Sequence, residues 1–175
     1  MLPGPLKGAP LTLGIVSVAD VWGRLVGRGA TPSGLGARDV LRLEAGLLLH
    51  GNDIDVGTNP YEAGLDKFVD PDHDGYVSGE NLKRIRDVGV TRELVGFKMT
   101  GRGIARHGYP IMCSNDHIGK VSSGGYSPTL DTNIGLGYVP TDFAALGTGF
   151  SIDIRGRFVE AEVVDLPFYS RGKLS

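Results

Sequence analysis

The chain is organised around the run Gly34-Leu35-Gly36-Ala37-Arg38-Asp39-Val40-Leu41-Arg42-Leu43-Glu44-Ala45-Gly46, which Gly51-Asn52-Asp53-Ile54-Asp55 follows closely. The apolar residues at 40, 41 and 43 predict a helical turn that faces a core. Arg38 and Arg42 are four residues apart and therefore share one side of that turn. A guanidinium held there can grip a carboxylate with two parallel hydrogen bonds, although most arginines at this spacing only solvate a helix face.

The composition indicates a folded protein. Hydrophobic residues make up 41% of the 175 residues and charged ones 22%, which favours a packed core over disorder. The 28 glycines favour turns and short strands. A net charge of -2 gives no reason to expect a nucleic acid or membrane partner. The single cysteine, Cys113, rules out an internal disulfide, and no apolar run reaches the ~18 residues that span a bilayer, so we expect a cytoplasmic protein.

The first half of the chain predicts short helices among irregular segments. The apolar spacing over 16–26 predicts an amphipathic helix, and Leu47–His50 predicts a short buried strand. Thr58-Asn59-Pro60 is a helix start, but Gly64 keeps that helix brief. A further helix is expected over 78–88, because Leu82, Ile85 and Val88 share one face and Gly89 follows.

The second half predicts strands. Alternating patterns occupy 93–99, 109–112 and 134–139, and the segments 151–154 and 157–164 predict a hairpin that turns at Gly156. Short strands with frequent Gly and Pro turns are typical of a small β-barrel or sandwich. We therefore predict an α+β fold in two domains, an incomplete α/β piece over 1–91 and an all-β module over 92–175.

An acidic run resembles the first half of a calcium-binding EF-hand loop. Asp70, Asp72 and Asp74 stand at the first, third and fifth positions of an EF-hand pattern, with Gly75 at the sixth. Asn81 occupies the twelfth position, where a glutamate closes such a loop. An acidic surface turn is therefore the prediction. Calcium binding is the alternative, and it would give a calcium-dependent melting shift that Asp70→Asn and Asp74→Asn abolish.

Two other sets of residues can be explained by a structural role as well as by a functional one. A metal site is not favoured at His50, Asp53 and Asp55, because they are too few ligands. A turn in which Asn52 and Asp53 form hydrogen bonds with backbone groups is preferred. The segment 101–108 is rich in glycine and arginine, and it is either a solvated loop or a contact for an acidic ligand or partner. We predict no metal site and no catalytic residue in the chain.

The central run resembles the corresponding segment of the glycine cleavage system T-protein family, the tetrahydrofolate-dependent aminomethyltransferases. Other blocks match that family in order and at the right spacing, from about Val18 to Arg171. They are Pro60–Leu65, Leu94–Phe97, Gly101–Pro110, Gly119–Leu130, Asn133–Pro140 and Leu166–Arg171. So many ordered matches make the resemblance specific.

The resemblance implies a reaction and three ligand contacts. A methylene group would pass from an aminomethyl-lipoyl arm on H-protein to N5 of tetrahydrofolate, with release of ammonia. The resemblance also implies a three-part architecture around a folate channel. Arg38 matches the arginine that the family places against folate, and Arg171 matches a second folate contact. Two guanidinium forks suit the carboxylates of the folate tail. Arg106 is expected to face the same channel or the H-protein.

The departures from the family limit the expected activity. Family members are roughly twice as long, and their first half carries an aspartate that positions N5 and a glutamate that reads the pterin. Neither has a counterpart in this sequence. We therefore expect the C-terminal half of an aminomethyltransferase, from a truncated gene or one of two split polypeptides, with weak folate binding and little catalysis alone. The alternative is a non-catalytic module that binds folate or H-protein.

Overall fold

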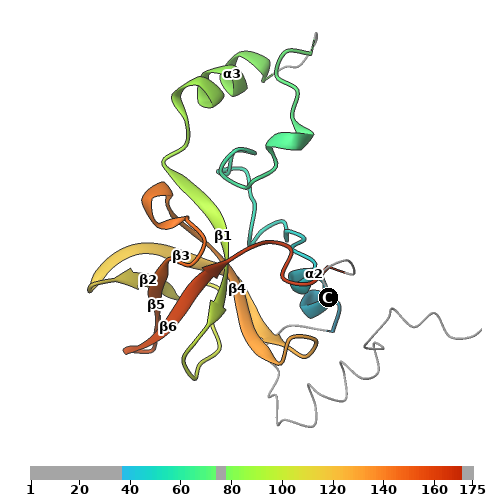
Figure 1. Ribbon diagram of the computed structural model, residues 1–175. Coiled ribbons are helices and arrows are strands. Elements are labelled where there is room, and N and C mark those ends of the chain that lie inside the picture. Colours follow the sequence, from blue (N-terminus) through green and yellow to red (C-terminus); the bar gives the residue numbers. More distant parts are fainter. Residues whose placement is uncertain (1–36, 74–77, 171–175) are drawn as a thin grey trace, which may run out of the picture.

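The structure is a computed structural model that describes residues 37–73 and 78–170 (Figure 1). The helix expected over 16–26, Asp74 and Arg171 lie outside these residues. The described chain contains the helices α2 (Ala37–Glu44) and α3 (Gly79–Val88) and the single 3-10 turns η1 (Asp66–Phe68) and η2 (Thr141–Phe143). None of the helices in these two stretches is long and apolar enough to cross a membrane.

Six strands form the main body. They are β1 (Arg92–Met99), β2 (Pro110–Cys113), β3 (Asp116–Ser127), β4 (Thr132–Pro140), β5 (Gly149–Ile154) and β6 (Arg157–Val164). These strands close a barrel in the order β1-β4-β3-β2-β5-β6, and every neighbouring pair is antiparallel. Because β1 pairs with both β4 and β6, the sheet has no open edge. The α+β prediction is confirmed, and the all-β module is a barrel rather than a sandwich.

The barrel encloses the larger of two apolar clusters. In β6 the buried residues Val159, Val163 and the alanine between them alternate with exposed ones, as expected for a strand with one face inward. Phe97 and Phe150 meet edge to face, with ring centroids 5.6 Å apart. The remaining members come from all the strands except β6 and from one loop, and they are Val95, Met99, Ala105, Ile111, Val121, Val139 and Ile152.

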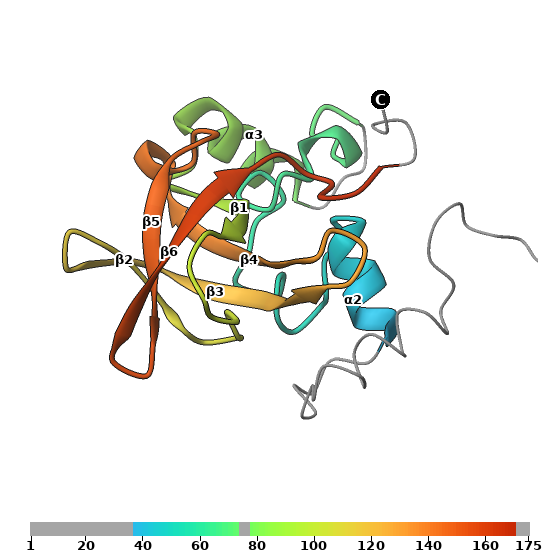
Figure 2. The ribbon, with the colours of Figure 1, turned by 60° about the horizontal axis from the view of Figure 1, so that its bottom comes forward.

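Helix α2 packs on the outside of this barrel. Leu43 is buried against Ile134 and Leu136 of β4, and this second cluster also contacts Leu166 and Phe168 of the C-terminal segment. Figure 2 shows α2 beside the ends of β3 and β4. The central run of the sequence is thus held against the barrel by an apolar contact on its buried side.

Helix α3 and the residues before it form an arm that stands away from the barrel (Figure 1). The predicted helix is confirmed, and Gly89 ends it with a φ of 85°. Leu82 is buried and Ile85 half-buried, but Val88 is exposed because the last turn has nothing to pack against. The arm is therefore a thin structure with little apolar burial of its own.

Two local predictions in the first half are wrong. Leu47–His50 forms no strand, because Gly46 and Gly51 turn the chain at both ends with positive φ, and only an isolated bridge joins His50 to Ile54. The residues after Thr58 form a single turn rather than a helix. Asn59 Oδ1 accepts a hydrogen bond from the backbone N–H of Glu62 at 3.0 Å, but Gly64, with a φ of 65°, ends the turn.

Candidate functional site

The second arginine of the central run is fixed by a buried carboxylate. The Arg42 Nη1 atom lies 3.0 Å from Asp53 Oδ2, and the Asp53 side chain is completely buried. The backbone N–H of Leu49 donates to the same oxygen at 2.8 Å, and Ser122 of β3 donates to Asp53 Oδ1 at 2.6 Å. Arg42 also donates to the Leu47 carbonyl. This network joins helix, loop and barrel, so Arg42 has a structural role.

The glutamate of the run makes a second anchor. Glu44 is buried, and its Oε1 accepts hydrogen bonds from Ser127 Oγ at 2.5 Å and from the backbone N–H of Thr129 at 3.2 Å. Thr129 Oγ1 donates to Oε2 at 2.8 Å. The Glu44 carbonyl accepts from the backbone N–H of Tyr169 at 2.9 Å. The end of β3, the connection that follows it and the C-terminal segment are thereby held to α2.

Arg38 remains free on this anchored helix. It is exposed, and within residues 37–73 and 78–170 no hydrogen bond or ion pair engages its side chain. The sequence placed Arg38 and Arg42 on one side of a turn, but their surroundings differ: Arg42 turns to Asp53 and Arg38 to solvent. An exposed arginine on a rigid element is well placed to bind an anion.

The structure describes one of the other two predicted ligand residues, Arg106. Arg106 is half-buried in the loop between β1 and β2, and no hydrogen bond or ion pair joins its side chain to the described residues. Its neighbour His107 is fixed by a hydrogen bond between Nδ1 and the Ser122 carbonyl, at 2.8 Å. Arg171 lies outside the described residues.

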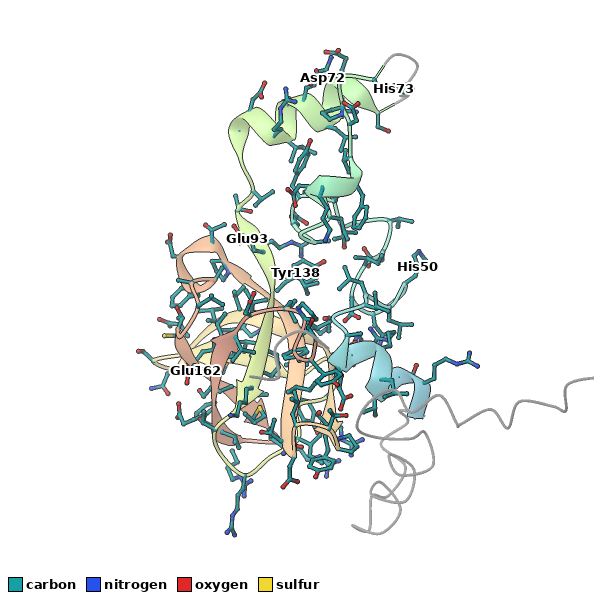
Figure 3. The ribbon with its side chains drawn as sticks, turned by 45° about the vertical axis from the view of Figure 1, so that its right-hand side comes forward. His50, Asp72, His73, Glu93, Tyr138 and Glu162 are labelled. Carbon is teal, nitrogen blue, oxygen red and sulfur yellow. The ribbon has the colours of Figure 1, made fainter. Side chains whose placement is uncertain are left out.

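A pocket of about 730 Å³ lies beside the Asp53 network. Its lining includes residues of the 51–58 loop, Tyr138 and the basic residues Arg92, His107, His117 and Lys120. Arg38 and Arg106 do not line it. Sequence reasoning missed Lys120 and Tyr138, because each lies in a strand with no motif that marks it as polar lining. Figure 3 shows Tyr138 on the side of the barrel that faces the arm.

Tyr138 gives a measurable pH dependence. Burial raises its pKa to about 12, and Arg92, 4.9 Å from the ring centroid, opposes that shift. Its hydroxyl donates to the Asp53 carbonyl at 2.8 Å. Because the folded state favours the neutral phenol, the resulting stability is complete below pH 10 and is lost as the pH rises through about 12.

Subtracting the tyrosinate absorbance titration of Tyr138→Phe from that of the unsubstituted protein should therefore isolate one tyrosine that ionises near pH 12. A difference curve centred on pH 10 would contradict this account of Tyr138.

No group of side chains in the described stretches could hold a metal ion. Asp53 is committed to Arg42, and His50 is exposed and directed away from the barrel (Figure 3). In the acidic run, Asp72 pairs with Arg86 at 3.0 Å and with Lys83 at 3.4 Å. The hydrogen bond from Arg86 and then that from Lys83 lower the pKa of Asp72. These ion pairs tie the turn to α3.

Comparison with known proteins places these features in one family. Residues 92–170 match the family model described as the glycine cleavage T-protein C-terminal barrel domain, and residues 12–73 match the GCVT N-terminal domain. The chain is 48% identical over 152 residues to an aminomethyltransferase of Thermosynechococcus vestitus, covering 87% of this chain and 42% of the relative. A relative from Halothermothrix orenii is 47% identical, with 92% and 46% covered.

A solved structure agrees. The crystal structure of glycine cleavage system aminomethyltransferase T from Bartonella henselae matches with a TM-score of 0.73 and 36% identity, over 76% of this chain and 38% of that one. The chain thus spans less than half the length of each of these relatives. The central run, the barrel and the comparisons agree, and the chain belongs to the glycine cleavage T-protein family of aminomethyltransferases.

Proposed function

We propose that this chain supplies the C-terminal part of a tetrahydrofolate-dependent aminomethyltransferase of the glycine cleavage system. The reaction would move a methylene group from the aminomethyl-lipoyl arm of H-protein to N5 of tetrahydrofolate and release ammonia. The division of the chain near residue 91, into a folate-domain piece over 1–91 and a barrel domain over 92–175, is part of the proposal. A single free cysteine, half-buried Cys113, fits a reducing compartment such as the cytoplasm.

The observation that carries this proposal is the state of Arg38. Its helix is fixed by two buried carboxylate networks, through Arg42 and Glu44, while Arg38 itself is exposed and uncommitted within the described residues. Because the helix is fixed, binding a carboxylate in the bidentate manner would order the Arg38 side chain without rearranging the backbone. The carboxylates of the glutamate tail of tetrahydrofolate fit that geometry.

The residues of this chain would therefore bind and orient tetrahydrofolate. The bound folate would supply N5 as the acceptor of the one-carbon unit. Arg38 would hold a folate carboxylate, and Arg171 would hold a second contact. Arg106 would face either the folate channel or the H-protein. No residue of the chain is assigned a catalytic role, because the family's N5-positioning aspartate has no counterpart in this sequence. Alone, the chain should bind folate weakly.

The test is reconstitution. The N-terminal polypeptide of the Thermosynechococcus vestitus relative, ending where the match to this chain begins, is supplied with this chain, H-protein and tetrahydrofolate. We expect ammonia release and methylene transfer only when both polypeptides are present. Folate or H-protein binding without turnover, with the N-terminal part bound, would instead favour the non-catalytic module. Full turnover by this chain alone would contradict the proposal.

In the reconstituted enzyme, Arg38→Ala should weaken tetrahydrofolate binding by roughly 10- to 100-fold, because a charge-assisted pair contributes about 1.5–3 kcal/mol. Arg84→Ala, which removes an exposed arginine of α3, is the matched control and should leave the affinity unchanged. Equal affinities for the two variants, measured by calorimetry, would remove Arg38 from the folate site.

A further inference from the structure

The pocket beside the Asp53 network contains donors that the fold leaves unused. We call it the basic pocket, after its lining residues Arg92, His107, His117 and Lys120, which come from β1, the loop after it and β3. The side chains of Lys120 and His117 are exposed, and neither forms a hydrogen bond or ion pair with the described residues. An ammonium and an imidazole in one hollow of about 730 Å³ favour an anionic ligand.

His107 is held so that one of its ring nitrogens stays available. Its Nδ1 bonds to the Ser122 carbonyl at 2.8 Å, and because a carbonyl only accepts, Nδ1 carries the hydrogen. Nε2 is therefore left for a ligand of the pocket that this ring lines. Lys120 lies over the same turn, since a Cβ atom at Gly108 would be 3.7 Å from Lys120 Cε. The imidazole and the ammonium thus meet on one side of the pocket, although they come from different elements.

The two carboxylates that line the pocket are already engaged. Asp53 is paired with Arg42 at 3.0 Å. Asp55 Oδ1 accepts hydrogen bonds from the backbone N–H of Gly57 at 2.8 Å and from Thr58 Oγ1 at 3.1 Å, which hold the loop in its turn. An anion that enters the basic pocket would therefore not have to break an ion pair of its lysine.

The remaining donors suit a phosphate group better than a carboxylate. A free guanidinium fork grips a carboxylate best, but Arg92 already donates from Nε and Nη2 to Glu62 Oε2, at 3.2 and 3.0 Å. Lysine and histidine donate from single points, which the three oxygens of a phosphate group accept from separate directions. A phosphate monoester also has a second pKa of about 6, so either the ester or the His107 ring can supply the proton that they share.

The pocket is larger than a phosphate ion needs. Beside the basic side chains it is lined by Ile118, Val139 and Pro140, and by Tyr138, whose hydroxyl donates to the Asp53 carbonyl at 2.8 Å. Pockets of roughly 300–1,000 Å³ take small organic ligands, whose apolar part lies against such residues while a few polar groups fix the orientation. A phosphate group on a compact aromatic or apolar body matches this lining.

We propose that the basic pocket binds a phosphate group, free or as part of a small organic phosphate, with Lys120, His117 and His107 as its donors. The apolar lining favours the organic phosphate. Arg38 does not line this pocket, so phosphate binding here would be independent of the folate contact and lies beyond the transfer reaction.

Calorimetry on the full chain, in chloride buffer of constant ionic strength, compares phenyl phosphate, inorganic phosphate and isophthalate, which carries two carboxylates on the same ring. Phenyl phosphate should bind at least about tenfold more tightly than the other two. Lys120→Gln should weaken its binding at least about tenfold, and His117→Gln at least about threefold, because each removes a charge-assisted donor. Lys98→Gln is the matched control: it removes an exposed lysine of β1 that does not line the pocket, so the affinity should not change.

A second result would also uphold phosphate recognition. Equal affinities for phenyl phosphate and inorganic phosphate, both lowered by Lys120→Gln, would identify the free ion as the ligand. Isophthalate that binds as tightly as phenyl phosphate would overturn the inference. So would the absence of saturable phosphate binding below about 10 mM, or an equal loss of affinity in Lys98→Gln and Lys120→Gln. Since the substituted side chains are exposed, all variants should keep the melting temperature of the unsubstituted chain.

Discussion

Asp53→Asn is expected to lower the free energy of unfolding by about 3 kcal/mol, because removing one member of a buried ion pair leaves the other charge uncompensated. The substitution keeps the shape of the side chain but removes the charge that Arg42, Leu49 and Ser122 all address. For a chain of this size the change corresponds to a fall of about 6–12 °C in melting temperature. Urea and thermal unfolding measure it.

The matched control is Asp116→Asn. Asp116 is exposed at the start of β3, and its side chain makes no hydrogen bond or ion pair with the described residues, so its loss should change the free energy of unfolding by no more than about 0.5 kcal/mol. If Asp53→Asn and Asp116→Asn had the same melting temperature, the Arg42–Asp53 network would not be what holds α2 to the barrel. The helix that carries Arg38 would then depend on the Glu44 hydrogen bonds and on the apolar contact of Leu43.

Gly119→Ala is expected to destabilise the barrel by about 3 kcal/mol or more, at the upper end of the cost of overpacking. A Cβ atom at this position would lie 2.0 Å from the Tyr138 carbonyl oxygen, which is backbone of the neighbouring strand β4. Backbone cannot rotate away as a side chain can, so β3 and β4 would have to separate. The lost ladder would also displace Lys120 and Ser122, which line the pocket beside Asp53.

Gly149→Ala is the control for this change. It lies in β5 of the same barrel, a Cβ there would meet nothing within 4 Å, and its φ is not in the left-handed region. Its effect should be neutral or slightly stabilising, by about 0.5 kcal/mol, because alanine restricts the unfolded chain. Similar unfolding midpoints in guanidinium for Gly119→Ala and the unsubstituted protein would show that the two strands are not closely apposed.

Local features of the fold could be predicted from the sequence. Gly89 ends α3, Gly156 forms the turn between β5 and β6, and the alternation in 157–164 marks a strand, since each depends on residues close together in the chain. Strand β3 has no comparable signal. Its glycines at 119, 124 and 125 interrupt the apolar alternation, and those at 119 and 124 are required by close approach to residues far away in sequence, such as Ala105.

The site could be predicted only in part. The spacing of Arg38 and Arg42 identified the helix, but it could not show which arginine turns inward, because Asp53 is brought to Arg42 by a fold-back of the loop that no local pattern encodes. No local pattern marks Glu44 as buried either, because Ser127 and Thr129, which surround it, lie far away in sequence. Leu47–His50 was expected as a buried strand because its three leucines follow one another, but the glycines at both ends turn the chain.

The most direct measurement of the central claim is the dissociation constant for tetrahydrofolate, determined by calorimetry for the chain alone and for its complex with the N-terminal polypeptide. If Arg38 is one side of a folate site that the other polypeptide completes, the complex should bind at least about tenfold more tightly, a gain of about 1.4 kcal/mol or more. The same dissociation constant with and without the N-terminal polypeptide would contradict that claim.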